Sequence, residues 1–215
     1  GNIASMMMRL AATGDKEMIP RAQGKFTKAL DCFEKGHDKK RQSYLLGSLG
    51  NLCLMQKELD KAQDYYQRAT TLMQETGDLL GEARGYANMG NVLSLKMDWD
   101  GAIEQIKKSL EIMERQENRP GIAQESEILG DLYFKKEQFH SCVEAFEGAS
   151  SLYDQMQEPR SVQRIQDKLV KVMAHPQYLD GRSEELRKIL KLPEAENDKT
   201  KKVAILTELG SVLYM

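Results

Sequence analysis

The sequence of 215 residues lacks the features that mark several classes of protein. Its three cysteines are an odd number for a disulfide framework, which indicates a reducing compartment. It contains no apolar run of about 18 residues that could form a transmembrane helix, and residues 1–8 lack the charged start and long apolar stretch of a secretion signal. Lysine and arginine (31) nearly balance aspartate and glutamate (33), so no net positive field favours nucleic acid or an anionic membrane. We therefore expect a cytoplasmic protein without membrane insertion and without a nucleic-acid partner.

Proline (5 residues) and aromatic residues (7%) are also scarce, and neither suits a helix interior as well as the residues that replace them. Leucine, alanine, glutamate, lysine and 12 methionines are abundant instead. Hydrophobic residues make up 40% of the chain and charged residues 30%, a balance that supports a packed core and argues against disorder. The composition therefore favours a folded, mainly helical protein.

An internal repeat of 40 residues organises the whole chain. Glycine preceded by a large apolar residue recurs at Gly50, Gly90, Gly130 and Gly210, and the slot between the last two holds Val170. A second column, twelve residues further on, is small in most units. It contains Ala22, Ala62, Ala102, Cys142 and, as the exception, Arg182. Helix axes approach to about 8–10 Å only where the crossing side chains are small, so both columns predict close crossings between two helices of each unit.

Each unit is predicted to form two helices joined by a short turn. In the first helix, apolar residues recur at spacings of three and four, as in Leu46, Leu49 and Cys53. The N-cap slot of the second helix contains Pro20, Asp60, Asp100 and Asp180. Aspartate there would accept hydrogen bonds from unpaired backbone amides, and proline is tolerated at a helix start. The units close on Gly77, Pro120, Gly121, Pro159 and Pro193.

This pattern resembles the tetratricopeptide repeat (TPR) over essentially the whole chain. The resemblance implies an all-α, right-handed superhelical solenoid of antiparallel helix pairs, with five 40-residue repeats and a half repeat. We expect a single solenoid domain over residues 1–215, with repeats at approximately 3–40, 41–80, 81–120, 121–160 and 161–200 and a half repeat at 201–215. The long repeat, with Leu49-Gly50-Asn51 and Met89-Gly90-Asn91, resembles the Leu-Gly-Asn adaptors that bind G-protein alpha subunits.

Catalysis is not expected. The three histidines, His37, His140 and His175, lie in different units, and no nucleophile, phosphate-binding or zinc motif occurs in the sequence. The three cysteines, Cys32, Cys53 and Cys142, fall in apolar columns of the repeat, so we expect buried and inert thiols. The sequence therefore predicts a non-enzymatic protein with no cofactor and no metal site.

The predicted binding surface lies on the first helices, on the side away from the core. In tetratricopeptide repeats this side lines a concave groove. The predicted peptide-binding residues are Tyr44, Asn51, Leu54, Met55, Arg84, Asn88, Asn91, Leu95, Phe134 and Lys135. Asn51 and Asn91 occupy the same position of adjacent units, and an asparagine ladder can pair with an extended peptide backbone. Arg84 could bind a carboxylate; alternatively, it pairs with Glu127 of the next unit.

These features predict an interaction scaffold or adaptor that binds a partner peptide or helix, with acidic residues or a free carboxylate, in the groove. Glu127 and Asp131 would repel an acidic ligand, so a peptide that is acidic at one end and basic at the other fits better. The alternatives are a ligand-gated or peptide-gated regulator and a purely architectural segment of a large assembly. The last residues read as the first helix of a sixth unit, so we expect the native chain to continue beyond Met215 and the exposed end to self-associate.

Overall fold

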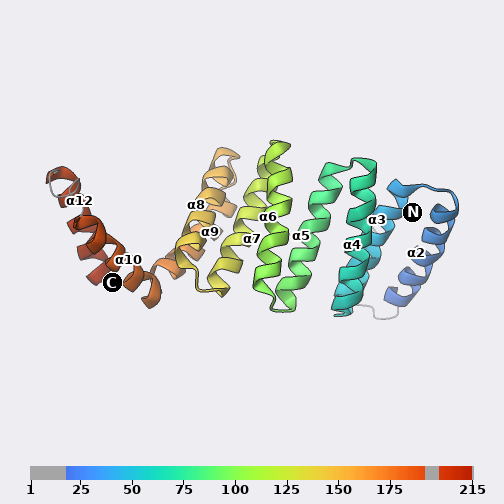
Figure 1. Ribbon diagram of the computed structural model, residues 1–215, viewed down its shortest axis with the longest axis horizontal. Helices are drawn as coiled ribbons and strands as arrows, with labels where there is room; N and C mark the ends of the chain where they lie inside the picture. The colour runs from blue at the N-terminus through green and yellow to red at the C-terminus, as the bar shows by residue number, and fades with distance from the viewer. Residues whose placement is uncertain (1–17, 192–198, 215) are drawn as a thin grey trace. The chain divides into compact units, whose positions relative to one another are not determined.

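The computed structural model describes residues 18–191 and 199–214, which form ten α-helices and no strand (Figure 1). The helices are α2 (Met18–Lys35), α3 (Lys39–Met55), α4 (Leu59–Thr76), α5 (Leu79–Leu95), α6 (Trp99–Arg115), α7 (Arg119–Lys135), α8 (Phe139–Gln155), α9 (Pro159–Met173), α10 (Pro176–Leu190) and α12 (Lys199–Tyr214). The first helices of successive pairs begin at residues 39, 79, 119, 159 and 199, which is the predicted period of 40. The expected all-α solenoid of helix pairs is therefore confirmed.

The chain divides into two compact units, one ending at Glu125 and the other beginning at Ser126. In the first unit each helix packs on the next, from α2 to α6. In the second unit α8 packs on α9, α9 on α10, and α10 on α12. The single domain over 1–215 and its repeat boundaries stay predictions, and the helix expected in residues 6–12 lies outside the described residues.

Three of the four recurring glycines lie where two helices touch, whereas an atom added to Gly210 meets nothing within 4 Å. A Cβ atom added to Gly50 would come within 2.6 Å of Tyr66 Cε1, and one added to Gly90 would come within 2.7 Å of Ile106 Cδ1. The same atom at Gly130 would overlap the Phe146 ring. A real Cβ atom would have to displace these side chains, so the predicted crossings are confirmed at Gly50, Gly90 and Gly130.

Seven of the turns between the described helices are spaced 20 residues apart, and each places one residue in the left-handed backbone region. The turn between α9 and α10, at Ala174 and His175, does not. Gly77 is the only glycine among the seven left-handed residues, with φ 69°. The other six are His37, Lys57, Met97, Glu117, Glu137 and Gln157, with φ between 50° and 63°. Left-handed backbone costs a residue with a Cβ atom about 1–2 kcal/mol, so six turns carry strain that glycine would relieve.

We predict that Met97→Gly stabilises the protein by about 0.5–1 kcal/mol. Met97 has φ 63° and a side chain that is 74% exposed, so glycine removes strain and little packing. The gain is reduced by about 0.5–1 kcal/mol because glycine makes the unfolded chain more flexible. Urea unfolding followed by circular dichroism measures the change. Met97→Ala is the control and should give no gain, because it keeps the Cβ atom. If the two variants were equally stable, the backbone at Met97 would not be strained.

The helix caps lie two residues before the predicted positions in two of the helix pairs. Asp98 is the N-cap of α6 and accepts a hydrogen bond from Gly101 N–H, while Glu58 is the N-cap of α4. Asp60 and Asp100 therefore lie in the first helical turn, and Asp180 lies inside α10. The turns are only two or three residues long, so the second helices start earlier than expected. Aspartate in a first turn still interacts favourably with the helix dipole.

The cysteines follow the prediction at two positions of three. Cys53 and Cys142 are fully buried, and burial raises the pKa of both thiols, that of Cys142 to about 12. Cys32, which was expected to be buried, is exposed. Its column lies at the margin of the core, where Leu72 is only half-buried.

Candidate functional site

A groove of about 470 Å³ opens in the first unit, across the first helices of successive pairs. Polar side chains from four helices line it: Tyr44, Ser48 and Asn51 from α3, Tyr66 from α4, Arg84 and Asn88 from α5, and Gln124 and Glu125 from α7. Four of the predicted peptide-binding residues, Tyr44, Asn51, Arg84 and Asn88, are thus brought together in one groove.

The groove exists because its floor is built from small residues. Gly47 and Ser48 of α3 and Gly81 and Gly85 of α5 line it. Gly85 has no room for a side chain, because an added Cβ atom would overlap the Thr70 hydroxyl. Gly47, where an added Cβ atom meets nothing within 4 Å, leaves open volume, while Gly81 and Gly85 let neighbouring side chains approach the helix. Sequence reasoning identified none of these four residues as part of the site.

Two of the predicted residues also support the structure around the groove. The Tyr44 hydroxyl donates to Asp78 Oδ2 at 3.0 Å, and Asp78 in turn caps α5 by accepting from Gly81 N–H at 2.9 Å. The Tyr66 hydroxyl donates to Asn51 Oδ1 at 2.5 Å, and burial raises the pKa of Tyr66. The oxygen of Asn51 is therefore occupied, which leaves its amide N–H groups as the part that can bind a ligand.

On α5, Arg84 and Asn88 also have unused hydrogen-bonding groups. Arg84 is exposed, and among the described residues of the first unit it has no ion-pair partner. Asn88 is half-buried and makes no side-chain hydrogen bond within that same part of the chain. A guanidinium and an amide on one helix face can together bind a carboxylate or a peptide backbone.

Glu125 is the one buried acid of the groove, and sequence reasoning missed it. The side chain is only 4% exposed. Ser109 Oγ donates to Oε1 at 3.0 Å, whereas Oε2 has no hydrogen-bond partner in the described structure. Burial raises the pKa of Glu125 to about 7, and the hydrogen bond from Ser109 opposes part of that rise.

The other predicted residues lie outside this groove lining. On α3 and α5, Met55 (41% exposed) and Leu95 (55% exposed) are on the surface, with Leu54 half-buried and Asn91 exposed. Phe134 and Lys135 belong to the second unit and are both exposed. Their part in binding stays a prediction.

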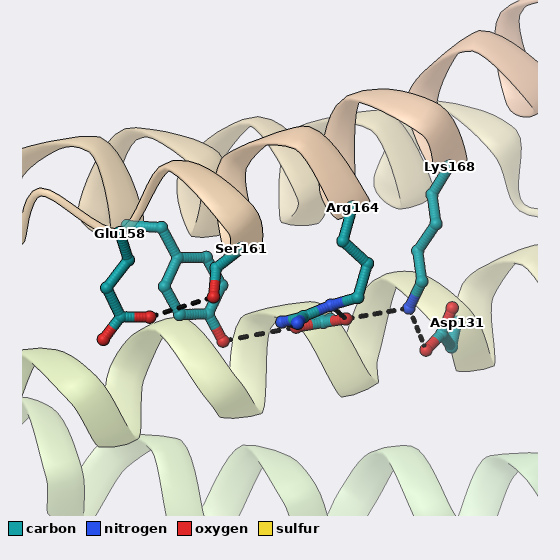
Figure 2. Close-up of polar contacts among 7 residues, drawn as sticks. Asp131, Glu158, Ser161, Arg164 and Lys168 are labelled. Carbon is teal, nitrogen blue, oxygen red and sulfur yellow. Dashed lines mark hydrogen bonds and ion pairs between the residues drawn. The ribbon is translucent and has the colours of Figure 1, made fainter.

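The second unit contains a network of ion pairs between α7 and α9. Glu127 binds Arg164 at 2.8 Å and Lys168 at 3.0 Å, and Lys168 also binds Asp131 at 2.7 Å. Figure 2 shows Lys168 reaching from α9 to Asp131 on α7, with Arg164 extending from α9 beside it. Burial alone would raise the pKa of Glu127, but the hydrogen bonds from Arg164 and Lys168 outweigh it and hold that pKa below its ordinary value.

This network bears on one sequence interpretation. Within the second unit Glu127 pairs with Arg164 and Lys168, and its pairing with Arg84 stays a prediction. Glu127 and Asp131, which were expected to repel an acidic ligand, are each paired with a cation. Repulsion from these two carboxylates is therefore largely neutralised.

In the part of the chain that the structure describes, no group of histidine, cysteine, aspartate and glutamate side chains could hold a metal ion. Over the same residues, no helix is both long enough and apolar enough to cross a membrane.

Comparisons with known proteins agree with the fold. The tetratricopeptide repeat family matches residues 41–115, which span α3 to α6. The apo form of RapI is similar, with a TM-score of 0.70 at 16% identity over 88% of this chain; the chain spans 53% of RapI. Nearly identical TPR-like repeats of a putative kinesin light chain from Podosopora anserina give a TM-score of 0.58 at 12% identity, over 98% of this chain and 94% of that one.

No curated protein sequence matches the chain. The structural likenesses have low sequence identity, so they bear on the fold alone. The comparisons thus give a tetratricopeptide repeat match over residues 41–115 and a solenoid fold shared with TPR-like structures over most of the chain.

Proposed function

We propose that this protein is a non-catalytic interaction scaffold that binds an extended segment of a partner protein in the groove of its first unit. The observation that carries the proposal is the groove itself, in which unpaired polar groups from α3, α5 and α7 line one open volume. Tetratricopeptide repeats in general suggest protein interaction, and the groove gives that interaction a location. The finer resemblance to the Leu-Gly-Asn adaptors and a cytoplasmic location belong to the same proposal.

The chemistry of the groove indicates what the segment presents. An extended peptide has unpaired backbone carbonyl groups, which the free N–H groups of Asn51 and Asn88 can bind. Arg84 favours a carboxylate, either an acidic side chain or a chain terminus. We therefore expect a partner segment with an acidic group near α5.

We predict that Arg84→Ala combined with Asn88→Ala weakens binding of the partner by roughly 10-fold to 100-fold. Hydrogen bonds to charged groups contribute about 1.5–3 kcal/mol. Affinity purification with the full chain identifies a partner, and calorimetry measures the affinity. The fold should not change, because Arg84 is exposed and neither side chain has a described hydrogen-bond partner in the first unit.

Arg160→Ala is the control, because it removes an exposed arginine from the second unit and should leave affinity unchanged. Asn91→Ala in the same assay tests whether the site extends along α5 to the predicted asparagine ladder. If wild type and the double variant bound the partner with equal affinity, the groove would not be the binding site and an architectural role would be favoured. The predicted self-association is a separate proposal, supported by the exposure of Val203 and Leu206 on α12.

A further inference from the structure

Glu125 occupies a position where the fold requires no charge. The corresponding residues of the other described units, five residues before the repeat glycine slot, are Leu45, Gly85, Ile165 and Ile205, and all are buried. Leucine and isoleucine therefore satisfy the packing at this position. The carboxyl group of Glu125 is an addition to the repeat pattern.

That carboxyl group is also incompletely bonded. Buried polar groups in proteins nearly always have hydrogen-bond partners, and a buried charge without one is costly. Glu125 has a single donor, Ser109, and its Oε2 atom has none among the described residues. Because Glu125 also lines the groove, a ligand there can supply the missing partner.

We propose that Glu125 receives a basic side chain, lysine or arginine, from the partner segment that the proposed function places in this groove. The inference rests on that function and adds the chemistry of a second contact. An ammonium or guanidinium group donates to the unpaired oxygen and neutralises the carboxylate as it becomes charged.

The other groups around the carboxyl favour a cation over an anion or a neutral group. The titratable groups of the groove lining are Tyr44 on α3, Tyr66 on α4, Arg84 on α5 and Glu125 on α7, while α6 contributes the Ser109 hydroxyl. Both tyrosine hydroxyls already donate, to Asp78 and to Asn51. Arg84 and Glu125 are thus the only charged residues of the lining, with opposite signs on neighbouring first helices. A segment with an acidic residue near α5 and a basic residue near α7 matches both.

The proposal predicts a proton coupled to binding. A carboxyl with a pKa near 7 is about half protonated at pH 7 and must lose its proton to pair with a cation. Binding at pH 7 should therefore release about half a proton, and affinity should rise about tenfold between about pH 6 and about pH 8.

The test uses the full chain and peptides selected from a displayed library of random peptides. Wild-type protein should select peptides that contain lysine or arginine at a recurrent position. Replacing that residue with citrulline or norleucine should weaken binding roughly 30-fold or more, since truncating one partner of a buried charge pair costs at least about 2 kcal/mol. Calorimetry in two buffers of different ionisation enthalpy measures the proton released.

Glu125→Leu and Glu125→Gln should each lose the preference for the basic residue, the pH dependence and the proton release. Leucine should fold well because Leu45 fills the same position in another repeat, and circular dichroism verifies this. Glu114→Gln is the control for charge, because Glu114 is exposed on α6 outside the groove lining.

The outcomes separate the two proposals. The selected peptides could lack a basic residue, bind Glu125→Gln as well as wild type, and bind Arg84→Ala more weakly. This result would overturn the inference about Glu125 but support the groove as the binding site. Peptides indifferent to both Arg84 and Glu125, or no selected peptide at all, would overturn the proposed function and the inference with it. Selection of basic peptides whose affinity is unchanged in Glu125→Leu would place the cation elsewhere and overturn the inference.

Discussion

Gly90→Leu should destabilise the first unit by roughly 2–3 kcal/mol, and overpacking of this kind occasionally costs more. A Cβ atom at Gly90 would lie 2.7 Å from Ile106 Cδ1 and 3.2 Å from the backbone oxygen of Ala102. The isoleucine is fully buried, so it has no free space to move into, and the Ala102 backbone oxygen cannot turn away as a side chain can. The two helices must therefore separate. Urea unfolding followed by circular dichroism measures the loss.

Gly148→Leu is the matched control for this prediction. Gly148 lies inside α8, is exposed, and has no neighbouring atom within 4 Å of an added Cβ. Leucine there gains helix propensity without a clash, so this variant should be more stable by up to about 0.8 kcal/mol. If Gly90→Leu behaved like Gly148→Leu, the assignment of Gly90 to the helix crossing would be wrong.

Glu125→Leu should stabilise the protein at pH 8 by about 2–3 kcal/mol. The pKa of Glu125 rises from 4.5 to about 7 on folding, so the folded state holds its proton more tightly than the unfolded state does. This stability is fully present below about pH 4.5, falls as pH rises through 7, and then stays low. A shift of this size corresponds to roughly 3 kcal/mol, and leucine gives up the hydrogen bond from Ser109 in exchange.

The measurement is the free energy of unfolding of wild type and Glu125→Leu between about pH 4 and about pH 9. The difference between the two should grow as pH rises from 4.5 to 7. Taking the difference matters because Glu127, whose pKa is lowered by Arg164 and Lys168, acts in the opposite sense and loses stability as pH falls. A pH-independent difference would mean that Glu125 titrates as an ordinary exposed carboxyl.

If Glu125→Leu both stabilises the fold and loses binding to basic peptides, then Glu125 lowers the stability of the fold and raises the affinity for the partner. A residue that weakens the fold at neutral pH, in a column where leucine and isoleucine fit, needs another explanation than packing. The proposed cation contact is such an explanation. If Glu125→Leu loses peptide binding and gains stability, Glu125 has a role in binding. If it gains stability and keeps peptide binding, Glu125 is a destabilising residue without that role.

The candidate site could be predicted from the sequence in part. Asn51 and Arg84 were found because they lie on the helix face away from the core residues, with Asn88 flanking it, and this is a local property of a 3.6-residue period. Glu125 was missed because its column lies between the expected core and groove faces, and only the structure shows that the whole column is buried. The sequence does contain a signal for this residue, because Glu125 is an acid at a repeat position that holds leucine or isoleucine in other units.

The positions of the turns were predictable, but their backbone geometry was not. Gly77 indicates a left-handed turn by its residue type, whereas Met97 and Lys57 do not. Both residues adopt a left-handed φ because the packing of the two flanking helices fixes the conformation of the turn, at the cost of local backbone strain. Likewise, Arg182 breaks the small-residue column in the sequence and, in the structure, forms ion pairs with Glu208 and Glu185.

The sequence by itself determined the period, the helix pairs and the glycine crossings. These depend on apolar spacing along one chain segment and on side chains too small to keep two helices apart. Only the tertiary structure decided which polar groups are used and which are left open. Glu127 has Arg164 and Lys168 as partners, 37 and 41 residues away, whereas Arg84 and Oε2 of Glu125 are left without partners in the described first unit. Such pairing depends on distances between side chains of adjacent repeats, and a one-dimensional pattern does not contain those distances.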